Sequence, residues 1–236
     1  MLKHLALFAL FADPVLSSGQ TDAAPSYGMV HHRIDDVDLG PVDIHLVDTL
    51  LDQKLPLVVF LGGSGAVPLI QLRKHDDGRW HPYSTFPMDQ NSLGRRYHFV
   101  LISKPGVALA DTVDDDATAD WPAAYTERLS PEWLARAASL AISEVLRHYP
   151  VDTSRIGVLG FSEGGQTAPR VAAIDGRVTH VMAFAGGGLN QLFEPIIAAR
   201  IAEAKGDLSH ADAQSAIEEL LADAERIYAD PGSTTK

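Results

Sequence analysis

The 236-residue sequence contains no cysteine, no long apolar run and no stretch rich in lysine or arginine. Without cysteine, the chain can form neither a disulfide framework nor a thiolate metal site, and it has no thiol nucleophile. No apolar run approaches the roughly 20 residues with which a helix crosses a bilayer. These absences exclude disulfide-rich scaffolds and cysteine-dependent enzymes, and they predict no membrane span.

Basic residues are in deficit, since 19 Lys and Arg stand against 31 Asp and Glu and give a formal net charge of −12. A surface of this sign repels polyanions. Neither nucleic acid nor an anionic membrane surface is therefore expected as a partner. The length and the apolar fraction of 46% favour one large α/β domain with a substantial core.

The first residues are typical of a secretory signal peptide. Lys3 precedes an apolar stretch over residues 5–12, and small residues follow at 17–19. A positive start, an apolar centre and small residues at a cleavage point mark exported proteins. The alternative is a packed N-terminal helix over residues 2–12. We expect residues 1–19 to be a signal peptide and the protein to be periplasmic or secreted.

Four apolar runs predict the strands of a sheet. They are continuous, rich in β-branched and aromatic residues, and typical of strands buried on both faces of a parallel sheet. The runs lie at residues 57–61, 99–102, 156–160 and 178–184. Two shorter stretches on either side of Gly40-Pro41 predict a hairpin over residues 37–47 at a sheet edge.

Helices are expected between the strands and near the C-terminus. Ser130 as N-cap and Pro131 at the first position predict a helix that ends before Pro150. Two more helices are expected over residues 192–204 and from Ser209 onward. Strands alternating with helices predict an α/β fold, a doubly wound and mostly parallel sheet with helices on both faces.

Two segments without a clear pattern, residues 66–95 and 104–129, are expected to be long loops. Loops of this length in a compact domain are usually functional or mobile. Their aromatic side chains can line a pocket or pack over the core, and the sequence leaves both open: Trp80, Tyr83, Phe86 and Trp121. The acidic run at 114–116 is expected to be a solvated part of the second loop.

The segment Gly160-Phe-Ser-Glu-Gly164 matches the G-x-S-x-G pattern of a nucleophile elbow. An elbow is a sharp strand-to-helix turn that exposes a serine above a sheet, with glycines on both sides so that backbones can approach. Here a predicted strand ends at Gly160 and a plausible helix begins at Gly165. In that setting Ser162 is the predicted nucleophile, and an ordinary glycine-rich turn is the alternative.

A second glycine-rich segment, residues 62–65, follows the earlier strand at 57–61. Backbone N–H groups stabilise the oxyanion that develops in acyl transfer, and glycines let the chain come close to a substrate. The expected donors are the N–H of Glu163 and one from Gly63 or Ser64. A tight turn or a phosphate-binding loop remains open, whereas dinucleotide spacing and a P-loop lysine are missing.

Together these segments resemble the α/β-hydrolase superfamily, especially its dienelactone-hydrolase-like and prolyl-oligopeptidase-like branches. The resemblance covers residues 27–190 and includes Asp152-x-x-Arg-Ile156 before the elbow. It implies a serine hydrolase without a cofactor that cleaves carboxylic esters, or less readily peptide or amide bonds, through an acyl-enzyme at Ser162. Leu61 stands where the family's pattern has histidine. An acyltransferase using the same serine and a non-catalytic binding protein remain alternatives.

A serine needs a histidine base and an orienting acid, which follow it in this fold. Only His180 and His210 lie downstream of Ser162, and His180 is expected at the opposite end of the sheet. His210 and Glu194 remain as candidates. We expect the strands that carry the histidine and the acid to be missing from this sequence. On that basis, a partial hydrolase core over residues 20–190 precedes a helical lid or cap over 191–236.

No metal site is predicted. His31-His32 lies in an extended segment, and His75 with Asp76, Asp77 and His81 lies in a loop. Neither group shows the helical spacing typical of metal ligands. The expected partner is a small-molecule or acyl substrate, and the sequence does not predict an oligomeric state.

Overall fold

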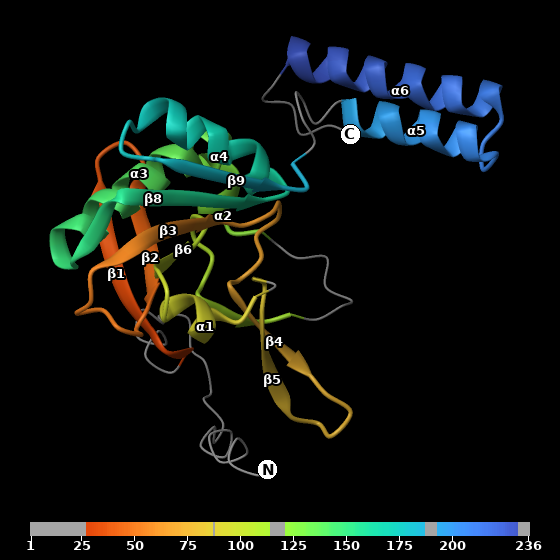
Figure 1. Ribbon diagram of the computed structural model, residues 1–236. Coiled ribbons are helices and arrows are strands. Elements are labelled where there is room, and N and C mark those ends of the chain that lie inside the picture. The colour runs from red at the N-terminus through yellow and green to blue at the C-terminus, as the bar shows by residue number, and fades with distance from the viewer. Residues whose placement is uncertain (1–26, 87, 114–120, 187–192, 231–236) are drawn as a thin grey trace.

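The computed structural model describes residues 27–86, 88–113, 121–186 and 193–230. Its centre is a six-stranded sheet with the order β1-β2-β6-β3-β8-β9 (Figure 1). The strands are β1 (Met29–Asp36), β2 (Gly40–Val47), β3 (Leu55–Leu61), β6 (His98–Ile102), β8 (Val151–Phe161) and β9 (His180–Phe184). The predicted signal peptide and the acidic run at 114–116 lie outside the described residues.

Four neighbouring strands of this sheet are parallel: β6, β3, β8 and β9. At one edge, β1 and β2 form an antiparallel hairpin, and β2 pairs antiparallel with β6. All four apolar runs are strands, so the predicted α/β fold with a mostly parallel sheet is confirmed. Within the described ranges, no helix is long and apolar enough to cross a membrane.

Helices cover both faces of the sheet. α3 (Pro131–His148) and α4 (Glu163–Ile174) lie above it in Figure 1, and the short α1 (Gln90–Gly94) lies below. The chain moves along the sheet in one direction from β3 to β6 and in the other from β6 through β8 to β9. Because such crossovers are right-handed, the reversal sends the connections to opposite faces.

The start of α3 is as predicted. The Ser130 hydroxyl accepts the N–H of Trp133 at 3.0 Å, and Pro131 occupies the first turn. Trp133 is buried and donates its indole N–H to the Leu39 carbonyl at 3.1 Å, which ties α3 to the β1–β2 hairpin. Small side chains let the helix approach the sheet closely. The fully buried ones on this face are Ala135, Ala137, Ala138 and Ala141.

The opposite face has a core of aromatic rings. Phe86 packs against Phe60 with ring centroids 4.4 Å apart and against Phe99 at 4.9 Å. Phe86 therefore belongs to the core, one of the two roles left open by the sequence. Trp80 and Tyr83 are instead exposed on β5 (Trp80–Ser84).

The edge hairpin differs from the prediction in register. Its turn lies at residues 37–39, and its first strand is residues 29–36, not the stretch before Gly40-Pro41. The turn forms at these residues because the Asp36 carboxylate accepts the N–H groups of Asp38 and Leu39, at 3.0 and 2.9 Å. Gly40 follows with a φ of 72°.

The prediction of two long loops was wrong. Residues 66–95 contain β4 (Ile70–Lys74), β5 (Trp80–Ser84) and α1, and residues 104–129 contain β7 (Ala110–Thr112) and α2 (Ala123–Arg128). β4 pairs with β5 and with β7 in a separate three-stranded sheet. The pairing of β4 with β7 joins segments 40 positions apart, which local sequence patterns cannot reveal.

β9 also departs from its prediction as a strand buried on both faces. All five of its residues are exposed, and within the described structure β8 is its only neighbour in the sheet. Phe184 is 56% exposed, whereas the apolar side chains of the central β3 are almost all buried. Burial depends on what covers a strand, and an apolar run alone does not report that.

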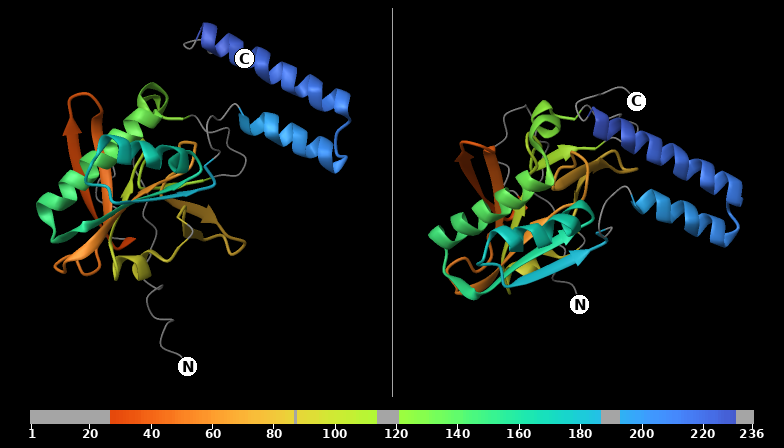
Figure 2. Two further views of the ribbon diagram at one scale, coloured as in Figure 1. Left: turned by 45° about the horizontal axis from the view of Figure 1, so that its top comes forward. Right: turned by 90° about the horizontal axis from the view of Figure 1, so that it is seen from above.

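The two C-terminal helices are present as predicted. α5 (Phe193–Lys205) and α6 (His210–Ala229) pack against each other, and Figure 2 shows this hairpin extending away from the main sheet. Ser209 caps α6 by accepting the N–H of Asp212 at 3.1 Å, and its hydroxyl donates to the Asp212 carboxylate at 2.6 Å. The predicted cap at this helix start is confirmed.

One buried histidine makes the fold sensitive to pH. His45 on β2 binds the Ser103 hydroxyl through Nε2 at 3.0 Å, while Nδ1 is buried without a partner. Burial lowers the pKa of His45 from 6.5 to about 4; nearby His31 lowers it further and Asp43 opposes the shift. Between pH 6.5 and about 4, His45 binds a proton in the unfolded chain but not in the folded one. The free energy of unfolding therefore falls as the pH is lowered through this range.

We expect the wild-type protein to lose about 2 kcal/mol more unfolding free energy than His45→Gln between pH 7.5 and 5.0. Glutamine can keep the bond to Ser103 but does not titrate. Urea unfolding at both pH values measures the difference. His32, whose pKa burial also lowers, is unchanged in both proteins and provides a common background. Equal losses in the two proteins would show that His45 is not the titrating group.

Candidate active site

The candidate site lies where two neighbouring strands send the chain to opposite faces. β3 and β8 pair in parallel, with Leu61 beside Gly160 at their carboxyl ends. The chain leaves β3 towards the α1 face, whereas β8 leads directly into α4 on the other face. In open α/β sheets such a point forms a crevice in which ligands bind. Residues 62–65 and Ser162 lie at this point, where the rule predicts the crevice.

Ser162 has the backbone conformation of a nucleophile elbow. Its φ of 55° and ψ of −117° belong to a backbone region that residues other than glycine rarely adopt. Holding a residue in such a conformation costs about 1–3 kcal/mol. Its N–H donates to the Phe184 carbonyl on β9 at 2.9 Å, and its carbonyl accepts the Gln166 N–H at 3.1 Å. β8, Ser162 and α4 thus form the predicted strand, turn and helix.

Both glycines of the motif are required by close backbone contacts. A Cβ on Gly160 would overlap the carbonyl oxygen of Gly164, and a Cβ on Gly164 would overlap that of Leu61. The Gly164 N–H donates to the Gly62 carbonyl at 3.0 Å, which joins the start of α4 to the loop after β3. The elbow and this loop therefore keep a fixed relative position.

The predicted oxyanion donors lie together at Ser162. A Cβ on Gly63 would be 3.3 Å from the Ser162 Cβ, so the loop runs directly past the serine. Among the described residues, no acceptor binds the N–H groups of Gly63, Ser64 or Glu163. Unpaired N–H groups beside a nucleophile are what a developing oxyanion requires.

Lys104, which no sequence motif indicated, holds this loop in place. It follows β6 and is buried, and its Nζ donates to the carbonyls of Gly63 and Gly65 and to the Glu163 carboxylate, the last two at 3.0 Å. Because a trans peptide points its C=O and N–H in opposite directions, binding the Gly63 carbonyl turns the Ser64 N–H away from Lys104. In the sequence, the signal that could have identified Lys104 is its position directly after the apolar run at 99–102.

Tyr125 on α2 completes the support and was also missed. Its hydroxyl accepts the Gly65 N–H at 3.1 Å, and its ring centroid lies 5.7 Å from the Lys104 Nζ. Burial raises the pKa of Tyr125 and lowers that of Lys104, and the Glu163 carboxylate counteracts the shift at Lys104. Trp121 packs edge-on against Tyr125 at 5.0 Å, which places it beside the loop but half exposed.

The two candidate triad residues lie elsewhere. His210 begins α6 and pairs with Glu203 on α5 at 2.6 Å, and Glu194 is exposed in the first turn of α5. His180 lies at the start of β9 beside Gly157, at the opposite end of the sheet, as expected. In the part of the chain that the structure describes, no histidine or carboxylate forms a hydrogen bond with the Ser162 hydroxyl.

Asp175, which directly follows α4, has a structural role. The Arg177 guanidinium binds its carboxylate at 2.7 Å and lowers the pKa of Asp175 to about 2, with the Ser139 hydroxyl as a further donor. These contacts join the end of α4 to α3, and they lie at the opposite end of α4 from Ser162.

No protein-family model and no curated protein matches the sequence. Similar solved structures include Pyrococcus horikoshii acylaminoacyl peptidase, with 18% identity over 72% of this chain and 24% of that one and a TM-score of 0.49. A thermostable esterase has 20% identity over 69% of this chain and 42% of that one, with a TM-score of 0.41. 2,6-Dihydroxy-pseudo-oxynicotine hydrolase has 16% identity over 84% of this chain and 50% of that one, with a TM-score of 0.46. The chain matches half or less of the length of these three structures, and the likeness concerns the fold.

We expect Gly164→Ala to lose about 3 kcal/mol or more of unfolding free energy, because its methyl group would meet the Leu61 backbone, which cannot move aside cheaply. Gly176→Ala is the matched control, since a Cβ there meets nothing within 4 Å and the change should stay within about 0.5 kcal/mol. Chemical denaturation of both variants measures the contrast. Similar values would mean that the elbow is not closely packed.

We expect Lys104→Met to lose about 3 kcal/mol, because it leaves the Glu163 carboxylate buried without its partner. The exposed Lys54→Met serves as the control and should change stability little. Adding Glu163→Gln to Lys104→Met should restore part of the loss. If the double variant is no more stable than Lys104→Met, the ion pair is not the cause.

Proposed function

We propose that this protein is a serine hydrolase that cleaves carboxylic esters through an acyl-enzyme on Ser162. One observation carries the proposal. Ser162 has a strained positive-φ conformation at the carboxyl ends of β3 and β8, next to backbone N–H groups that have no acceptor among the described residues. Backbone strain of this kind persists where surrounding contacts enforce it, and it is concentrated at functional sites.

The reaction follows from these groups. The Ser162 Oγ attacks the carbonyl carbon of the ester, and the negative charge that forms on the carbonyl oxygen is stabilised by the N–H of Glu163 and of Gly63 or Ser64. The alcohol leaves with the proton that came from Ser162, and water then hydrolyses the acyl-enzyme. The proton needs a base to carry it, and the proposal requires that base to come from outside the described residues.

Lys104 acts in this proposal as a positioning residue. Its Nζ is occupied by the Gly63 and Gly65 carbonyls and the Glu163 carboxylate. It therefore holds the donors in place and does not take the serine proton. Preorganised donors contribute to catalysis because they need no rearrangement as charge develops.

The α5–α6 hairpin is proposed as a lid over the crevice. α5 exposes Phe193, Ile197 and Ile201, each about half accessible and spaced four residues apart, so they form one apolar stripe. Phe161 and Phe184 are also exposed, and they pair side by side at the ends of β8 and β9, next to Ser162. Contact between the stripe and these rings would exclude water from an apolar acyl chain.

A non-catalytic binding protein is the second candidate. The observation that favours it is the absence of a histidine or carboxylate at the Ser162 hydroxyl within the described ranges. Without a base a serine is a poor nucleophile, whereas the crevice could still bind a ligand.

Labelling with a fluorophosphonate probe tests the proposal, using the protein as its gene encodes it. We expect one label per chain, mapped by mass spectrometry to the peptide with Ser162 and abolished by Ser162→Ala. Lys104→Met, in variants that still fold, should label at least about tenfold more slowly because the oxyanion donors are misplaced. A folded wild-type protein that takes no label contradicts the hydrolase and favours the binding protein.

A further inference from the structure

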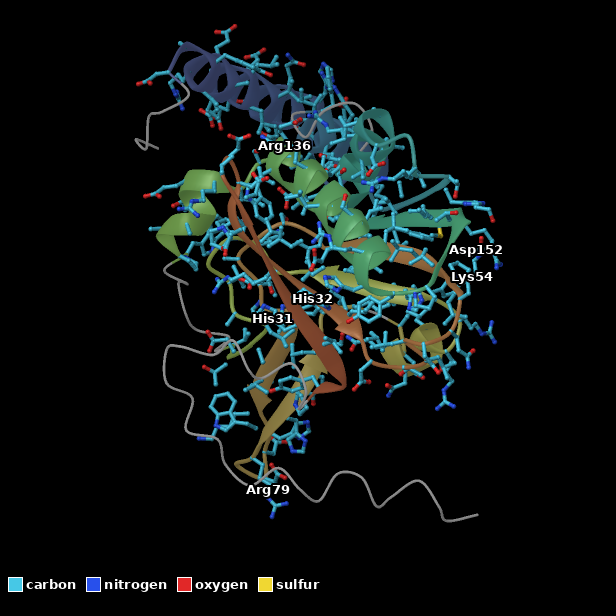
Figure 3. All side chains as sticks on the ribbon, turned by 90° about the vertical axis from the view of Figure 1, so that its left-hand side faces the viewer. His31, His32, Lys54, Arg79, Arg136 and Asp152 are labelled. Atoms are coloured by element: carbon cyan, nitrogen blue, oxygen red, sulfur yellow. The ribbon has the colours of Figure 1, made fainter. Side chains whose placement is uncertain are left out.

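We propose that His32, Glu144 and His148 form a binding site for a divalent transition-metal ion, most suited to Zn²⁺. His32 comes from β1, and Glu144 and His148 lie one turn apart near the end of α3. Figure 3 views the molecule from the β1 side and labels His32 on this strand. The site joins the sheet edge to the helix and is independent of Ser162.

The ligand atoms have the spacing of a small metal site. The Glu144 Oε1 lies 3.4 Å from the His32 Nδ1 and 3.0 Å from the His148 Nε2, and the three atoms all lie within 4.8 Å of one another. Tetrahedral zinc with bonds of about 2.0–2.1 Å holds its ligand atoms about 3.3 Å apart. A small adjustment of the exposed His148 side chain is enough to centre an ion between them.

Neighbouring groups orient two of the ligands. The His32 Nε2 lies 2.8 Å from the Tyr149 hydroxyl, and Arg147 donates to the other oxygen of Glu144. When Nε2 carries the proton and donates it to Tyr149, the Nδ1 lone pair points towards Glu144 and His148. Metal-ligating histidines are typically fixed in this way by a hydrogen bond at the other nitrogen.

Burial and ligand type indicate the kind of ion. The side chains of His32 and Glu144 are only 16% and 12% exposed, whereas that of His148 is 45% exposed. An ion would therefore be held from inside and open to water on the His148 side. Two imidazoles and one carboxylate suit zinc, nickel or copper better than calcium or magnesium, which prefer oxygen ligands alone.

The sequence pattern predicted no metal site, because His31-His32 shows no helical ligand spacing. That spacing is on α3, where Glu144 and His148 are four residues apart and share one face. His32 pairs with Ile44 on β2, and this register places it on the α3 side of the sheet. The ligand set exists only after the strand and the helix pack together.

Isothermal titration of the metal-free protein with Zn²⁺ at pH 7.5 tests the proposal. We expect one ion per chain, a rise in Tm of about 5 °C at saturating Zn²⁺, and the loss of both in His148→Gln. Tyr149→Phe keeps all three ligands but removes the orienting hydroxyl, and it should weaken binding by about 10-fold or more. Circular dichroism checks that each variant is folded.

His210→Gln is the matched control. His210 also pairs with a glutamate, Glu203, but no third ligand joins them among the described residues. It should bind Zn²⁺ as the wild type does. Failure of the folded wild-type protein to bind Zn²⁺, or undiminished binding by His148→Gln, overturns the proposal. Loss of binding in His81→Gln alone would assign the ion to the β4–β5 hairpin and would overturn the proposal as well.

Discussion

The close approach of two backbones at the carboxyl ends of β3 and β8 is the constraint on which the candidate active site depends. The Gly164 N–H binds the Gly62 carbonyl, and neither Gly160 nor Gly164 leaves room for a side chain. These contacts hold the elbow against the loop after β3. They also support the unfavourable backbone conformation of Ser162, because the turn cannot relax without separating two strands of the central sheet. The position of the serine is thus a property of the sheet as much as of its motif.

Charged side chains then fix segments that the sheet alone would leave free. Lys104 leaves the end of β6 and neutralises Glu163 on α4 while it binds two carbonyls of the loop beside Ser162. On the far side of the molecule, Glu144 draws His32 and His148 together. In both places a largely buried carboxylate needs partners, since an unpaired buried charge is strongly destabilising. One cluster supports the proposed chemistry of the crevice, and the other joins the edge hairpin to α3.

Local patterns predicted those elements whose signal lies within a few neighbouring residues. The four apolar runs are strands, Ser130 and Pro131 start α3, and Ser209 caps α6. The prediction failed where pairing decides the structure. Residues 66–95 and 104–129 contain a small sheet whose strands β4 and β7 are far apart along the chain. The turn of the edge hairpin shifted because Asp36 binds the N–H groups of Asp38 and Leu39.

The sequence by itself determined the types of the main elements, the strand–turn–helix around Ser162 and the exclusion of thiol chemistry. Only the tertiary structure decided which side chains meet. Lys104 and Glu163 are 59 positions apart, and His32 and Tyr149 are 117 apart. It also left β9 exposed, although four of its five residues are apolar. The physical reason is that periodicity reports which face of its own element a residue takes, whereas strand order and register decide which distant element packs against that face.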